Sequence, residues 1–205
     1  MITRTLFPGL CAALMAIPAD AAMVITIDPD APGINDGDDI STFFAGSGVT
    51  LSAVGGSSSE GKVYAYESWF APTGSLVFGW NDGSFLDDHW GRSSSPTFKA
   101  TFSGSLPQKV EIDYLSEGTV TLTAYDSSDN VLGSVSEAGD FDPHTLTFTS
   151  TGYDIKWISV DISGTGLDYG LLDNLRITVV PEPGAVGLAS GLAALGFIWW
   201  RRRTA

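Results

Sequence analysis

Apolar and polar residues alternate in short runs through most of the chain, and turn residues separate these runs. In residues 109–114, for example, Val110, Ile112 and Tyr114 alternate with charged residues, as is typical of a half-buried strand. Between the two ends of the chain, no stretch has a sustained helical period. We expect about nine or ten strands, over residues 24–27, 49–54, 62–66, 109–114, 119–125, 131–136, 145–149, 155–162 and 172–179.

This pattern predicts an all-β domain over residues 23–180. Many short strands without a long-period repeat pack most simply as an antiparallel two-sheet β-sandwich of jelly-roll-like form. The run from Asp126 to Asn130 predicts the turn of a hairpin between two of the strands. Residues 69–95 are the least regular part, and we expect long loops and short strands there.

The N-terminal residues 1–22 have the pattern of a signal peptide. Arg4 precedes an apolar stretch over residues 6–17, and small residues follow, with cleavage expected after Ala21 or Ala22. Such a segment predicts an N-terminal signal helix that signal peptidase removes. The alternative is an N-terminus that stays on the protein without an export role.

The C-terminal residues 181–205 combine a polar triplet, an apolar span and a basic end. An uncharged stretch over residues 185–200 would cover roughly 25 Å as a helix, just enough to cross a bilayer. Three arginines would then stay on the cytoplasmic side. The motif consists of Pro181, Glu182, Pro183, Arg201, Arg202 and Arg203.

This tail resembles the PEP-CTERM sorting signal of Gram-negative bacteria. The resemblance implies export across the inner membrane, a C-terminal transmembrane helix in the precursor, and cleavage near the triplet by an exosortase. It also implies a mature protein at the cell surface or outside the cell. The alternatives are a permanent membrane anchor or a buried helix, and a run of arginines without acidic partners disfavours the latter.

The middle of the chain is strongly acidic and lacks cysteine. The whole chain has 10 basic and 24 acidic residues, and its single cysteine is Cys11 in the signal segment. Removing both ends leaves 6 basic and 22 acidic residues. Nucleic acid is therefore excluded as a partner, and so are disulfides and thiolate metal sites. A divalent cation, or solubility alone, explains such a surface better.

Asp173 is the most informative polar residue. Alternation along residues 172–179 places it on the same face as Leu175 and Ile177, which predicts an inward-facing carboxylate. A buried carboxylate needs a cation, a capping role or hydrogen-bond donors. The alternative is an exposed position at the strand mouth, bonded to loop amides.

The middle of the chain also resembles galactose-binding-type sandwiches. Asp28 after the first strand, the Gly-Val-Thr-Leu strand at residues 48–51 and Leu-Asp-Asn-Leu at residues 172–175 carry this resemblance. It implies a structural Ca²⁺ held by Asp173 and Asp28, with Asp30 as a helper.

Aromatic residues suggest a carbohydrate-binding face. The rings of Trp69, Trp80 and Trp90 could stack on sugars, although such residues are more often core or lid. The sequence Asp87-Asp88-His89 could suggest a metal or acid–base cluster, but neighbours on a strand point to opposite faces, which favours a solvated loop.

The sequence as a whole predicts an exported, non-catalytic structural or adhesive component of the cell surface or extracellular polymer matrix. The alternative is a calcium-dependent carbohydrate-binding module that binds polysaccharide. A small secreted hydrolase ranks last, because no Gly-x-Ser-x-Gly motif or singled-out carboxylate pair is present.

Overall fold

A computed structural model describes residues 22–81, 86–90, 95–164 and 170–179. These residues contain twelve strands and one short 3-10 helix, η1. In chain order the elements are Met23–Ile27 (β1), Phe43–Ser47 (η1), Val49–Val54 (β2), Tyr64–Glu67 (β3), Leu76–Asn81 (β4), Leu86–Asp87 (β5), Thr97–Phe102 (β6), Lys109–Ser116 (β7), Thr119–Tyr125 (β8), Val131–Ala138 (β9), Pro143–Thr149 (β10), Trp157–Ser163 (β11) and Gly170–Val179 (β12).

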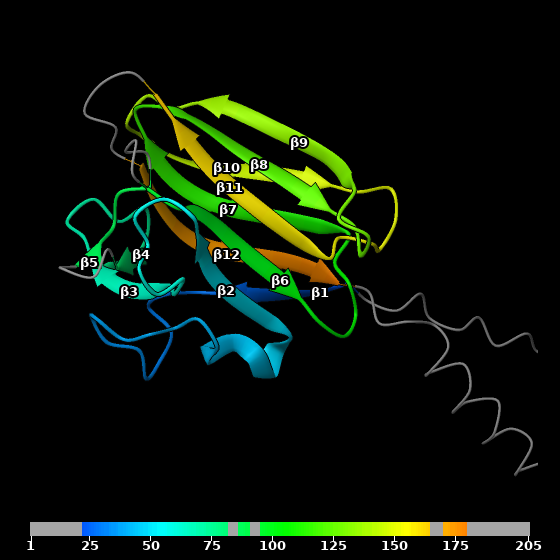
Figure 1. The fold of residues 1–205 in the computed structure, drawn as a ribbon, viewed down its shortest axis with the longest axis horizontal. Coiled ribbons are helices and arrows are strands. Elements are labelled where there is room, and N and C mark those ends of the chain that lie inside the picture. The colour runs from blue at the N-terminus through cyan, green and yellow to red at the C-terminus, as the bar shows by residue number, and fades with distance from the viewer. Residues whose placement is uncertain (1–21, 82–85, 91–94, 165–169, 180–205) are drawn as a thin grey trace, which may run out of the picture. The chain divides into compact units, whose positions relative to one another are not determined.

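The strands form two antiparallel sheets that stack as layers (Figure 1). The smaller sheet has the order β2-β6-β11-β8-β9. The larger sheet has the order β10-β7-β12-β4-β3, and β1 pairs with β12 while β5 pairs with β4. The predicted all-β, two-sheet antiparallel sandwich is therefore confirmed.

The hydrophobic core lies between the two sheets, because each sheet turns one face inward. Ile112 and Tyr114 point inward from β7, and Leu122 points inward from β8; none of the three is exposed to solvent. The intervening residues of β8 are partly or fully exposed, so the predicted alternation is present in the structure. Burial of this apolar surface is the main stabilising contribution to the sandwich.

Three strands within and after the irregular region, β4, β5 and β6, had no predicted bounds. β4 is buried at five consecutive positions, so its sequence does not alternate and looks like a short apolar run. β6 does alternate, with Phe98, Ala100 and Phe102 buried. β6 pairs with both β2 and β11, so the middle of the smaller sheet depends on it.

A β-bulge in β12 changes the expected orientation of Asp173. Leu172 pairs with Tyr114 and Leu175 pairs with Ile112, so the register shifts between them and Asn174 is the extra residue, with φ 24°. Asp173 therefore lies on the outer face of the larger sheet, not on the core face that alternation predicted. It is nevertheless fully buried, because another segment of the chain covers it.

An ion pair on this outer face connects β7 and β12. The guanidinium of Arg176 donates two hydrogen bonds of 2.6 Å to the carboxylate of Asp113, and Thr145 donates a third. Burial alone would raise the pKa of Asp113, but the bonds from Arg176 and Thr145 outweigh it and lower that pKa. The outer face of the larger sheet thus holds charges that are paired rather than solvated.

The predicted signal peptide and sorting tail lie outside the described residues. Within the part of the chain that the structure describes, no helix is long and apolar enough to span a membrane. Those two helices remain predictions from sequence.

Replacing Arg176 by Met should destabilise the domain by about 2–3 kcal/mol, because Asp113 is 8% exposed and loses its only cationic partner, keeping the neutral donors Thr145 and Asn174. Urea unfolding at pH 7 measures this loss. Lys109→Met is the matched control on the same sheet. Lys109 forms an ion pair with Glu111, and their side chains are 38% and 22% exposed, so the loss of unfolding free energy should stay below about 1 kcal/mol. Equal losses in the two variants would contradict the buried-pair interpretation.

Candidate functional site

A groove on the outer face of the larger sheet is the strongest candidate site. Its volume is about 500 Å³. Leu115 of β7 and Leu171 of β12 form its floor and are directly paired. The other lining residues come from β3 and the loop after it, the segment after β5 and the β9–β10 loop: Tyr66, Glu67, Ser68, Trp69, Phe70, Asp88, His89 and Phe141. The groove therefore combines aromatic, aliphatic and charged side chains.

Trp69 and Phe70 stand at the groove with much of their surface in water. Trp69 is 97% exposed and Phe70 is 57% exposed. Phe70 packs edge-to-face on Phe141, with ring centroids 5.7 Å apart. Adjacent exposed aromatic rings beside a hollow are a common sign of a ligand surface.

The aspartates that were predicted to bind calcium hold the loop carrying these two rings. Asp173 accepts hydrogen bonds of 2.9 Å and 2.7 Å from the backbone N–H and the hydroxyl of Thr73. Asp30 accepts bonds from the backbone N–H groups of Ser75 and Leu76. The β3–β4 loop is thus hydrogen-bonded both to Asp30, which follows β1, and to Asp173 in β12.

This bonding needs glycine at position 74. Gly74 has φ 58°, and a Cβ there would collide with a carboxylate oxygen of Asp30.

Asp173 is bonded on its other oxygen to the backbone N–H of Asn174. Burial raises the pKa of Asp173 to about 6, although the bonds from Thr73 and Asn174 oppose that rise.

All three carboxylates of the predicted calcium site accept hydrogen bonds from the protein, and of the three only Asp173 is fully buried. Asp28 uses one oxygen to accept the backbone N–H of Asp30, and the oxygens of Asp30 and Asp173 accept loop donors. Among the described residues, a different group of three acidic and histidine side chains brings its ligand atoms within 4.8 Å of one another. The calcium site at Asp28, Asp30 and Asp173 stays a prediction.

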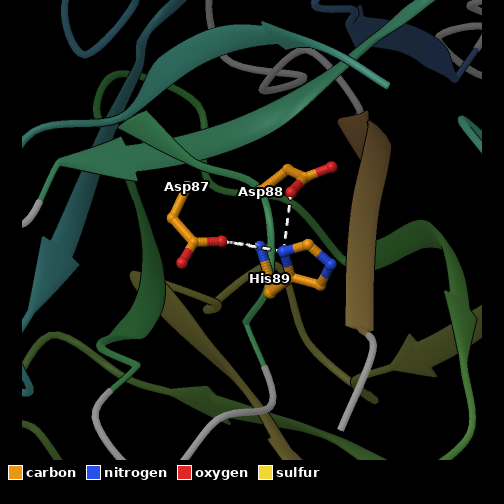
Figure 2. Close-up of side chains that lie close together, drawn as sticks. All are labelled: Asp87, Asp88 and His89. Atoms are coloured by element: carbon orange, nitrogen blue, oxygen red, sulfur yellow. Dashed lines mark hydrogen bonds and ion pairs between the residues drawn. The ribbon is translucent and has the colours of Figure 1, made fainter. Parts of the chain in front are cut away.

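The group that does come together is Asp87, Asp88 and His89 (Figure 2). Nδ1 of His89 lies 2.8 Å from an oxygen of Asp87 and 2.8 Å from an oxygen of Asp88. The backbone N–H of His89 also donates to Asp87, which curls the segment into a tight turn. Both aspartates are buried, so the solvated loop favoured by the sequence is wrong: the turn overrides strand alternation and brings both carboxylates to one ring nitrogen.

The two carboxylates keep the imidazole protonated. Burial by itself lowers the pKa of His89, but hydrogen bonds to Asp87 and Asp88 and their negative charges outweigh it and raise the pKa to about 9. The same charges, after burial, raise the pKa of Tyr66 in the groove. The three ligand atoms could instead hold a divalent cation, and binding it would release the proton from His89.

Trp80 and Trp90 do not form a sugar-stacking face with Trp69, which corrects the sequence prediction. Each is 2% exposed, so neither ring is available to a ligand. Their indole N–H groups instead donate to backbone carbonyls, from Trp80 to His89 and from Trp90 to Phe78. The two tryptophans fix the segment that carries the Asp87–Asp88–His89 cluster, and Trp69 alone keeps the predicted exposure.

Comparisons with known proteins give fold-level similarity only. No family model and no curated protein matches the chain. Among solved structures, the chain is similar to a point mutant of a family 29 carbohydrate-binding module, with 14% identity, TM-score 0.42, and 77% of this chain and 92% of that chain covered.

Two further structures are similar to the chain at the same level. One is a family 61 carbohydrate-binding module in complex with β-1,4-galactotriose, with 15% identity, TM-score 0.40, and coverage of 67% of this chain and 94% of that one. The other is a cleaved adhesin domain of Lys-gingipain, with 14% identity, TM-score 0.35, and coverage of 75% and 88%. TM-scores below 0.5 carry no argument about the ligand, so any proposal depends on the groove itself.

The cluster predicts an unusual histidine titration. NMR of the two histidine rings should give His89 a pKa of about 9. Asp88→Asn should lower it toward 6.5, because one carboxylate is lost, while the signal of His144, which pairs with Asp140 instead, should not move. A wild-type His89 that titrates near 6.5 would contradict the paired geometry.

The titration has a consequence for stability. The pKa of His89 is 6.5 as a free group and about 9 in the folded domain, so the folded state binds the proton more tightly. This contribution to stability is fully present below about pH 6.5 and is lost as the pH rises through 9. The free energy of unfolding in urea should therefore fall between these pH values, and less so in Asp88→Asn.

Proposed function

We propose that this is an exported, non-catalytic protein whose groove binds a polysaccharide chain. The observation that supports this most is Trp69, an indole ring 97% exposed beside Phe70 at a groove of about 500 Å³. An exposed Trp held by an anchored loop is organised for contact with a partner rather than for packing.

The chemistry of the groove matches a sugar ring. The C–H face of a pyranose can stack on an indole, while its hydroxyls can bond to charged and polar side chains at the rim. Glu67, Asp88 and His89 lie in the groove and offer carboxylate acceptors and an imidazolium. Because acidic groups dominate this lining, a neutral or amino-sugar chain is a better ligand than a uronic-acid polymer.

The state of the cluster supports a binding role over hydrolysis. Hydrolysis by paired carboxylates needs one neutral acid and one free base on either side of a bond. Here both Asp87 and Asp88 are directed at the same protonated nitrogen of His89. Two carboxylates around one imidazolium can orient the hydroxyls of a bound sugar, and their mutual contacts stabilise the wall of the groove.

The export part of the proposal comes from the two ends of the chain. Signal peptidase would remove residues 1–22, and an exosortase would process the PEP-CTERM tail at residues 181–205 in the inner membrane of a Gram-negative bacterium. The sugar-binding domain would then act in the extracellular polymer matrix or at the cell surface, as a structural or adhesive component.

Trp69→Ala should weaken binding to a soluble polysaccharide at least tenfold while leaving the melting temperature unchanged, because the ring contributes little to packing. A glycan array first selects the polymer, and titration calorimetry measures the loss. Phe43→Ala is the control, since Phe43 is an aromatic residue 50% exposed and is not among the groove's lining residues. Equal binding by the two variants would refute the groove proposal, and release of reducing ends by the purified protein would refute the non-catalytic part.

The intact mass of the protein from its native host tests the sorting proposal. The mature form should lack residues 1–22 and residues 201–205, because both ends are processed during export. Glu182→Ala should leave unprocessed precursor in the membrane. Retention of Arg201 to Ala205 in the mature wild type would mean a permanent anchor, and normal processing of the variant would remove Glu182 from the recognised motif.

A further inference from the structure

The outer face of the smaller sheet has a composition unlike the rest of the domain. Strand register places one residue from each of its five strands in a single row across the sheet: Ser52, Lys99, Ser159, Thr123 and Ser134. In the neighbouring row, Asp161, Thr121 and Ser136 follow one another from β11 to β9. We call these two rows the hydroxyl face.

The hydroxyl face is electrically balanced in a domain that is otherwise strongly acidic. Between the two ends predicted to be processed there are 6 basic and 22 acidic residues. The two rows of the hydroxyl face hold one charge of each sign, Lys99 and Asp161, and the carboxylate of Asp129 adjoins the face at Trp157. Lys99 forms no ion pair with a carboxylate of the described residues; its ammonium lies 4.0 Å from the ring centroid of Trp157. A face without excess charge does not repel a neutral polymer or require counterions to be displaced.

A hollow of about 260 Å³ adjoins the hydroxyl face and is bounded by a stack of side chains. Lys99, Ser159 and Asp161 of the face line it, together with Val54, Thr97, Tyr125 and Trp157. The rings of Tyr125 and Trp157 stack with centroids 3.5 Å apart and an interplanar angle of 7°. Lys99 covers the other side of Trp157, and the indole N–H of Trp157 donates to Asp129 at 2.7 Å. The stack therefore offers a fixed ammonium and ring edges, not an open ring face.

The hydroxyl groups are held in regular positions. Neighbouring strands are about 4.8 Å apart, so the first row presents hydroxyl or ammonium groups at multiples of that interval from Ser52, Lys99, Thr123 and Ser134, while the central Ser159 is buried. Threonine is branched at Cβ and keeps few rotamers, so little side-chain entropy is lost when a ligand orders it. Cross-strand pairing already orders some of them, since the hydroxyls of Thr121 and Ser136 lie 2.9 Å apart.

We propose that the hydroxyl face is a second binding site, which takes an extended neutral polysaccharide chain laid across the strands. Serine and threonine hydroxyls both donate and accept, as sugar hydroxyls do, and the threonine methyls and the edge of Trp157 contact C–H groups. Since the groove lies on the other sheet, one molecule would then hold two chains; this bridging depends on the proposed function of the groove.

The test replaces hydroxyls without changing shape. Thr121→Val with Thr123→Val removes two hydroxyls and keeps β-branched side chains, so the strand should fold normally. The matched control is Thr147→Val with Thr149→Val, which removes two exposed hydroxyls from β10 of the other sheet. Both doubles are made in the wild type and in Trp69→Ala, and equal melting temperatures check folding.

Binding is measured by affinity electrophoresis in gels with hydroxyethyl cellulose, β-1,4-galactan or galactomannan, and with alginate as a charged polymer. In the Trp69→Ala background, the control double should still be retarded by a neutral polymer, and Thr121→Val/Thr123→Val should bind at least fivefold more weakly. Equal retardation of the two doubles would overturn the second site, as would a Trp69→Ala protein that binds none of the neutral polymers.

Failure of the two proposals gives different results. If only the hydroxyl-face variant loses binding, the groove proposal fails and the second site stands. If only Trp69→Ala loses binding, the second site fails. When both sites act, the wild type should cross-link a neutral polymer and raise its viscosity, whereas each single-site variant should not.

Discussion

The β-bulge at Asn174 determines what the larger sheet presents on each face. One extra residue between Asp173 and Leu175 lets Leu172 and Leu175 both enter the core. The same shift puts Asp173 and Arg176 on the outer face, where Arg176 neutralises Asp113. Without the bulge, a carboxylate would enter an apolar core at a cost of several kcal/mol.

The bulge connects the fold to the groove through Asp173. A carboxylate buried on the outer face requires donors, and the backbone and hydroxyl of Thr73 supply them. Satisfying this charge fixes the loop that carries Trp69, so an exposed aromatic ring stands on a rigid support. The buried carboxylate thus anchors the loop that carries the exposed ring.

Sequence patterns predicted the parts of the fold that depend on local alternation. β8 alternates throughout and β7 alternates over its first four residues. The turn between β8 and β9 is held by Asp126, which accepts the backbone N–H groups of Ser128 and Asn130. β4 could not be predicted this way, because it is buried on both faces. The exposure of each tryptophan was also out of reach, since it depends on distant partners such as the carbonyl of Gly170, which accepts the backbone N–H of Trp90.

The distribution of charge is compatible with the two proposed binding sites for neutral polymers. Acidic residues in the loops and on the larger sheet give the domain a net negative charge, which keeps copies apart. The smaller sheet can then leave its outer face neutral, because serine and threonine stay hydrated and do not associate as apolar faces do. Recognition by hydroxyl groups gains little from any single contact and depends on many aligned ones, so a regular sheet suits an extended chain while the groove suits a single stacked ring.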